Sequence, residues 1–229
     1  MTLTSLKRCA TLLAALAAIS LTPQLRAQKA AGAAIASSMA ENAEKLKHYT
    51  FKQKVEVYFK GELKRTSVSQ IHYDSSGERV AIPLETTPAA DSQPRRRIGR
   101  KIAEAKKDEM KDYIERLTGL MGQYLPPTKD KIQAALPGAQ FGQPEPGLAV
   151  ATLPDYLKPG DSMAITLNAA ARRITQLEVK SSLDSDPVSI VVNFSQLPDG
   201  TNYPATTSVK SEAKEIELRI STDDYQPQP

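Results

Sequence analysis

The side chains of this chain that could do chemistry are one serine, two histidines and a few acidic residues near turns. Ser162 follows Gly160-Asp161 at the start of an expected strand, a position at which a histidine base can activate a serine nucleophile. His48 and His72 are the two histidines. We therefore consider two kinds of chemistry, nucleophilic hydrolysis by the serine and metal binding by the histidines.

The segment Gly160-Asp161-Ser162-Met163 resembles the start of the motif of GDS-type esterases. That family places its serine near the N-terminus and its histidine far downstream, whereas here both histidines precede Ser162. A nucleophile also needs a positioned base. We therefore interpret the segment as a turn that leads into a strand, and we predict no catalytic residue and no enzyme activity.

The pattern for a metal site is equally weak. His48 and His72 flank two neighbouring expected strands, but the sequence supplies no matching cysteine or acidic cluster. The segment Asp184-Ser185-Asp186-Pro187 lacks the glycine and the terminal glutamate of a calcium loop. We predict a turn there whose aspartates bond their own backbone, with no metal and no cofactor.

A basic stretch from 95 to 111 contains eight Lys or Arg residues against three acidic ones. Clustered charge can attract anionic lipid headgroups or cell-wall polymer. The same stretch can equally be a solvated loop and helix face, and three acid and base pairs at helical spacing favour this interpretation. These pairs are Glu104 with Lys107, Asp108 with Lys111, and Asp112 with Arg116.

The N-terminal segment is typical of a secretory signal. Lys7 and Arg8 precede an uncharged run over 10–21, and Leu25-Arg26-Ala27 places a small residue at the expected cleavage point. A membrane-spanning helix needs about 20 apolar residues, and this run is shorter. We expect a cleaved signal peptide over 1–27, a mature chain from Gln28, a periplasmic or secreted location, and no integral membrane segment after cleavage.

Composition narrows the classes of protein that remain. Removing 1–27 takes away three basic residues and no acidic one, so the net charge falls from +4 to +1. The mature chain therefore lacks the strong positive charge that is typical of nucleic-acid-binding domains, and we predict no nucleic-acid partner. Cys9, the one cysteine, lies in the signal without a lipobox before it, which excludes a disulfide scaffold. Residues 28–229 fit one domain, and the oligomeric state stays open.

Hydrophobic periodicity predicts helices at 29–47, 98–124 and 129–136, joined to strands that make up the rest of the domain. The inserted helical pair spans 98–136 and follows a loop from Pro83 to Arg97. Nine strands are expected, because short runs alternate between apolar and polar residues and end at turn residues. Val68 is out of phase with Ile71 and Tyr73, which indicates a bulge or a weak register.

These elements predict an α+β fold with a curved, mainly antiparallel sheet, an unclosed half-barrel covered by the N-terminal helix and the helical pair. Short turns make neighbouring strands antiparallel, and an apolar face must be buried. The long helix would then close an apolar groove. We expect nine residues to line this groove: Phe51, Val55, Val57, Phe59, Tyr113, Leu117, Ile216, Leu218 and Ile220.

The element order resembles the periplasmic lipoprotein-carrier family and its relatives that sort outer-membrane lipoproteins. The segments that carry the resemblance are 45–73, with the phrase Tyr49-Thr50-Phe51-Lys52-Gln53-Lys54-Val55, and the closing hairpins over 197–225. The resemblance implies an unclosed barrel under helices that holds acyl chains or another apolar partner. Aromatic residues are only 5% of the chain, whereas the known carriers line their cavity with many.

Two functions remain from the sequence. The first is an exported, non-enzymatic protein that binds a lipid, a lipidated protein or another apolar ligand in the groove. The second is an envelope interaction or structural protein whose groove is filled by its own helices.

Overall fold

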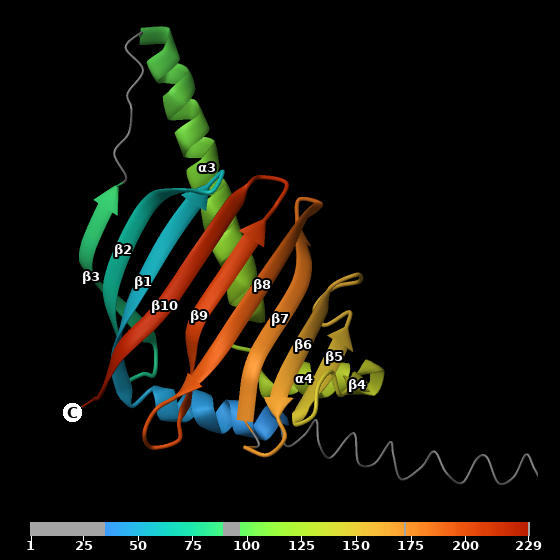
Figure 1. Ribbon diagram of the computed structural model, residues 1–229. Coiled ribbons are helices and arrows are strands. Elements are labelled where there is room, and N and C mark those ends of the chain that lie inside the picture. The colour runs from blue at the N-terminus through green and yellow to red at the C-terminus, as the bar shows by residue number, and fades with distance from the viewer. Residues whose placement is uncertain (1–34, 89–96, 172, 229) are drawn as a thin grey trace, which may run out of the picture.

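The computed structural model describes residues 35–88, 97–171 and 173–228, which form one open antiparallel sheet with helices on one face (Figure 1). The strand order is β3-β2-β1-β10-β9-β8-β7-β6-β5-β4. The strands are β1 (Tyr49–Phe59), β2 (Glu62–Tyr73), β3 (Arg79–Pro88), β4 (Gln140–Gly142), β5 (Leu148–Pro154), β6 (Ser162–Asn168), β7 (Arg173–Leu183), β8 (Asp186–Gln196), β9 (Asn202–Ser211) and β10 (Ile216–Pro227). The predicted half-barrel α+β fold is confirmed.

Two-residue turns set the register of two hairpins. Lys60 and Gly61 join β1 to β2 with φ values of 53° and 76°, and Asp184 and Ser185 join β7 to β8 with 51° and 72°. Two successive positive φ values are the geometry whose twist matches that of antiparallel strands. Gly61 adopts this conformation at no steric cost.

Helices cover the inner face of the sheet, which we define as the face that carries the core residues. A helix over 35–46 lies along one end of the strands, and α3 (Arg97–Tyr124) crosses behind the sheet and projects beyond the opposite ends of the strands (Figure 1). Next follow α4 (Lys129–Ala135) and a 3₁₀ turn, η1 (Leu136–Gly138). Thr128 caps α4 by accepting a hydrogen bond from the backbone N–H of Lys131 at 3.4 Å.

The core lies between α3 and the inner face. Apolar side chains at every second position of the strands are buried, and the stripe of α3 covers them, as the two periodicities predict. From α3 the buried residues are Tyr113, Leu117, Leu120 and Tyr124. From β6 to β10 they include Met163, Ile165, Leu177, Val179, Val188, Ile190, Val192, Val209, Ile216 and Leu218.

The structure corrects several boundaries. There are ten strands and not nine, because the short β4 pairs with β5. The third strand extends from Arg79 to Pro88 instead of ending at Ile82, so the first part of the expected loop is paired with β2. The predicted irregularity is found where the register shifts between Val68 and Ser69, opposite Glu85 and Pro83, which leaves Leu84 as the extra residue.

Some expectations fall outside the described residues. The signal over 1–27 lies there, and so does the part of the expected loop over 89–96. Among the described helices, none is both long enough and apolar enough to cross a membrane.

Candidate functional site

The predicted groove residues separate into three groups. Five of them lie in the core that α3 and the inner face form together: Val57, Tyr113, Leu117, Ile216 and Leu218. Cross-strand pairing brings Val57 opposite Leu218, and Phe59, which is partly buried against the core, lies opposite Ile216. Their side chains fill the inner face together with the stripe of α3.

Val55 and Ile220 form the second group. They pair directly with each other across β1 and β10 and are partly buried. They continue the inner-face alternation one step beyond Val57 and Leu218.

Phe51 lies elsewhere, in an aromatic cluster at the start of β1. Its ring stacks on Tyr225 with the ring centroids 4.7 Å apart, and Tyr203 contacts Tyr225 at 4.5 Å. Burial raises the pKa of the Tyr225 hydroxyl. The pairing of β1 with β2 runs without a shift from Phe51 to Val57, so Phe51 keeps the alternation of Val55 and Val57. The shift between Thr50 and Lys52 in the pairing with β10 lies on the β10 side, where Asp224 has a positive φ.

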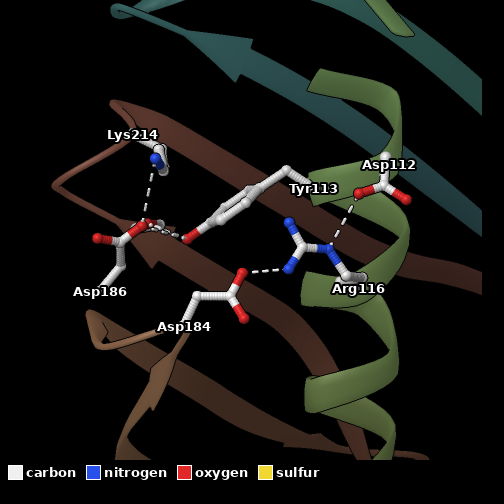
Figure 2. A network of polar contacts seen from close by, with 7 residues as sticks. Asp112, Tyr113, Arg116, Asp184, Asp186 and Lys214 are labelled. Atoms are coloured by element: carbon white, nitrogen blue, oxygen red, sulfur yellow. Dashed lines mark hydrogen bonds and ion pairs between the residues drawn. The ribbon is translucent and has the colours of Figure 1, made fainter. Parts of the chain in front are cut away.

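Polar contacts join the middle of α3 to two hairpin turns (Figure 2). We call this set the Arg116 network: Asp112, Tyr113, Arg116, Asp184, Asp186, Ser211 and Lys214. The Arg116 guanidinium donates to Asp184 in the β7–β8 turn and to Asp112 one helical turn earlier, the latter at 3.1 Å. The Tyr113 hydroxyl lies 2.8 Å from the hydroxyl of Ser211 and donates to Asp186 at 3.5 Å.

The contacts of the Arg116 network test two predictions made from the sequence. Asp184-Ser185 is the predicted turn, but Asp184 pairs with Arg116, and Asp186 accepts from Tyr113 and pairs with Lys214 at 3.6 Å. The interpretation that these carboxylates bond their own backbone is therefore wrong. The expected pair of Asp112 with Arg116 is present.

The other expected helix pairs differ. Lys111 pairs with Glu115 at 3.8 Å and not with Asp108, while the side chains of Glu104 and Lys107 lie outside the described part of the structure. Both observed pairs are exposed, and such pairs contribute little to stability.

The C-terminal end of α3 is joined to the sheet by a buried carboxylate. Tyr124 donates to Asp161 at 2.5 Å, and its hydroxyl lies 2.8 Å from Ser181. Asp161 is 3% exposed and also accepts from the backbone N–H groups of Leu157 and Lys158, each at 3.1 Å. Burial, followed by the hydrogen bond to Asp161, raises the pKa of Tyr124 to about 12.

This arrangement explains the Gly160-Asp161-Ser162 segment. Asp161 closes the turn between β5 and β6, and its backbone carbonyl accepts from the N–H of Asp155 at 2.9 Å. Ser162 begins β6, five strand spacings from β1, which follows His48. At ~4.8 Å per spacing the separation is on the order of 20 Å, too far for a base to reach a nucleophile.

Both histidines lie toward the β3 end of the strand order, far from β6. His48 directly precedes β1, and His72 lies near the end of β2 opposite Val80 of β3. Within 35–88, 97–171 and 173–228, no group of three His, Cys, Asp or Glu side chains is close enough to hold a metal ion.

Sequence reasoning missed the polar groups that hold α3. It placed Tyr124 on the apolar stripe and Asp161 in a turn, but their contact joins residues 37 positions apart. The available signal was chemical: a tyrosine on a buried stripe needs a partner for its hydroxyl. The sequence alone did not say which of the many acceptors would supply it.

The sequence matches no protein-family model and no curated protein. Solved structures that resemble the fold include a LolA superfamily protein from Nitrosomonas europaea, with a TM-score of 0.40 and 10% identity over 85% of this chain and 94% of that one. A putative outer membrane lipoprotein-sorting protein domain from Vibrio parahaemolyticus has a TM-score of 0.35 and 10% identity over 83% and 91%.

A DUF1329 family protein from Desulfovibrio piger has a TM-score of 0.37 and 6% identity over 84% of this chain and 93% of that one. The first two of these three structures carry names from the group that the element order resembles, and all three are 10% identical to this chain or less.

Proposed function

We propose that this protein is an exported, non-enzymatic binding protein that holds an apolar ligand, a lipid or a lipidated partner, between α3 and the inner face of the sheet. The observation that carries the proposal is that the apolar stripe of α3 packs on the apolar inner face of the sheet. Leu117 and Leu177 are both fully buried in the core that α3 and the sheet form. Displacing α3 would convert this core into an apolar groove.

The contacts of α3 support such a movement. Toward its middle, α3 meets the turns through Arg116 and Tyr113, whose polar groups can exchange protein partners for water. Between Tyr113 and Tyr124, the side chains of Leu117 and Leu120 make apolar contacts with the core. Exposing a buried leucine costs about 1.5–3 kcal/mol, so opening is unfavourable without a ligand. An apolar ligand that replaces the helix stripe would offset this cost.

The remaining parts of the proposal rest on the sequence and on the distances above. The signal-like segment over 1–27 supports export, and intact-mass measurement of the secreted protein would test it. A mature chain that still carries these residues would contradict it. The separation between Ser162 and the region of His48 supports a non-enzymatic role.

A second candidate function has its own observation. Leu117 and Tyr124 already fill the inner face, at 0% and 1% exposure. This favours an envelope interaction or structural protein with a self-filled core and an active outer surface.

A cross-link separates the two functions. Arg116 and Asp184 meet across the gap between α3 and the β7–β8 turn, so Arg116→Cys with Asp184→Cys places two thiols in a chain whose one native cysteine, Cys9, lies in the expected signal. A short bis-maleimide would then hold α3 closed. The ligand probe is cis-parinaric acid, a fluorescent long-chain carboxylate, read with and without iodide as an aqueous quencher.

We expect the uncross-linked double variant to take up probe that iodide cannot quench, and the cross-linked protein to lose this protected fraction while keeping its thermal stability. Protected uptake that is unchanged by the cross-link would overturn the groove. If the wild-type protein takes up no protected probe and yields no co-purified lipid on solvent extraction and mass spectrometry, the structural role takes its place.

A further inference from the structure

An open cleft of about 610 Å³ lies outside the groove, between the helix of residues 35–46 and the connection from α3 to α4. We call it the helix cleft. Its apolar lining comes from Met39, Ala40 and Ala43 on one side and from Pro126 and Pro127 on the other. The volume falls within the roughly 300–1,000 Å³ of small-molecule sites.

Residues at the helix cleft also pack against the core. Met39 lines the cleft and also packs against the buried cluster under α3. Leu125, which directly precedes Pro126, packs against the same cluster. A molecule in the cleft therefore contacts, through Met39, the apolar interior that α3 covers.

The rim carries charge on both walls. Glu41, Glu44 and Lys45 lie on the helix side, and Lys129 lies on the α4 side. Glu44 is paired with Lys47 at 2.8 Å, while within the described ranges neither Lys45 nor Lys129 forms an ion pair. With Glu44 neutralised by Lys47, the rim is left with a net positive charge, which favours an anionic group at the mouth.

The shape and chemistry of the lining select the ligand. The ten lining residues are aliphatic or polar, and none of them is aromatic. Such a wall suits a flexible saturated chain better than a flat ring, which gains from stacking on aromatic faces. The cleft is open on one side, so a chain can enter it without displacing α3.

We propose that the helix cleft binds one acyl chain that carries an anionic end group, with the end group between Lys45 and Lys129 and the chain along Met39 and Pro127. This inference rests on the proposed function in taking the ligand to be apolar, but it names a second site that stays available while α3 is closed. A ligand there would dock before it reaches the groove.

The test uses the protein in which α3 is cross-linked, so that the groove is shut. We expect one cis-parinaric acid per chain to remain bound and to be quenched by iodide, because the cleft is open. Ala43→Trp fills the cleft and should weaken this binding at least tenfold, whereas Ser38→Trp, at an exposed position of the same helix outside the lining, should leave it unchanged. Retained binding in the Ala43→Trp protein would overturn the proposal.

A charge variant keeps the test decisive if Ala43→Trp fails to fold. Lys45→Gln with Lys129→Gln should weaken binding of the acid roughly three- to tenfold, the size expected for two exposed charge contacts, and should leave its methyl ester unaffected. Lys64→Gln with Lys180→Gln makes the same charge change on β2 and β7 as a control. Equal weakening by both pairs would contradict a role for the rim lysines.

The outcomes separate the two sites and the two sources of an acyl chain. If cross-linking abolishes all binding, the groove remains as the binding site and the helix cleft is excluded. If all binding is quenched by iodide and no protected fraction is found, the helix cleft remains and the groove is excluded. Palmitate should displace the probe from the cross-linked protein, whereas a palmitoylated peptide, whose acyl chain ends in a neutral linkage, should displace it far less; equal displacement by the two would contradict the anionic end group.

Discussion

Tyr124, the last residue of α3, donates a 2.5 Å hydrogen bond to Asp161, a carboxylate that is 3% exposed in the turn between β5 and β6. Asp161 also accepts from the backbone of Leu157 and Lys158. One buried carboxylate therefore fixes both the turn and the end of the helix that covers the sheet. The pair of Arg116 with Asp184 is exposed by comparison, with side-chain exposures of 43% for Arg116 and 58% for Asp184.

Replacing Asp161 should destabilise the fold. Asp161→Asn puts an amide N–H₂ among hydrogen-bond donors and leaves buried groups unsatisfied, so the free energy of unfolding should fall by about 1–3 kcal/mol. Urea denaturation measures it. Ser162→Ala, at the next position, should change the free energy of unfolding by less than about 0.5 kcal/mol; an equal loss in both variants would remove the special role of Asp161.

Stability should fall steeply in alkali. The pKa of Tyr124 is raised from 10.0 to about 12 by burial and by Asp161, and burial raises that of Tyr156 to about 12. Between pH 10 and 12 the unfolded chain loses these protons while the folded one keeps them. The free energy of unfolding therefore decreases with pH in this window, by up to about 1.4 kcal/mol per pH unit for each tyrosine.

Tyr124→Phe removes one of these groups and should make the decline between pH 10 and 12 shallower. Leu120→Val loses packing without removing a titrating group and should keep the wild-type slope. The measurement is the urea midpoint as a function of pH. Identical slopes in all three proteins would show that Tyr124 ionises as readily in the folded chain as in the unfolded one.

The Arg116 and Asp184 pair should contribute little to global stability. A double-mutant cycle with Arg116→Ala and Asp184→Ala is expected to give a coupling of about 0.2–1 kcal/mol, as for exposed ion pairs. Amide hydrogen exchange in α3 should nevertheless accelerate, because local opening needs less free energy than global unfolding. A coupling well above this range would argue against a helix that opens easily.

Changing both histidines should have no effect on binding. His48→Ala with His72→Ala is expected to leave cis-parinaric acid uptake within twofold of the wild-type value, since the groove and the helix cleft contain neither residue. The same titration on Leu117→Ala, which alters the core under α3, gives the contrast. A clear loss of uptake in the histidine variant would reveal a site that includes them.

The exposed edge strand should promote self-association. Ile82 and Leu84 on β3 are 49% and 53% exposed, and among the described strands β3 ends the sheet with one unpaired edge. Exposed apolar edge strands pair with other chains, and lysine blocks this pairing. Ile82→Lys should lower aggregation on heating, measured by light scattering, with little change in the unfolding midpoint. Thr87→Lys adds the same charge near the end of the same strand without removing an apolar side chain. Equal protection by both variants would show that the added charge alone lowers aggregation.

The sequence by itself determined the class of fold. Alternation in β8 and β10 fixed which side chains face the core, because period two leaves each strand one apolar face. The stripe of α3 from Tyr113 to Tyr124 was equally readable. The turn at Asp184-Ser185 followed from the cluster of turn-forming residues over 184–187.

The tertiary structure decided what those local rules do not reach. The alternating pattern stopped at Ile82, but pairing with β2 continues β3 to Pro88 past the extra residue Leu84, because a bulge depends on the partner strand. The partners of Tyr124 and Arg116 lie 37 and 68 positions away. Which of many acceptors a buried hydroxyl or a guanidinium meets depends on the path of the whole chain, and no local spacing in the sequence encodes that choice.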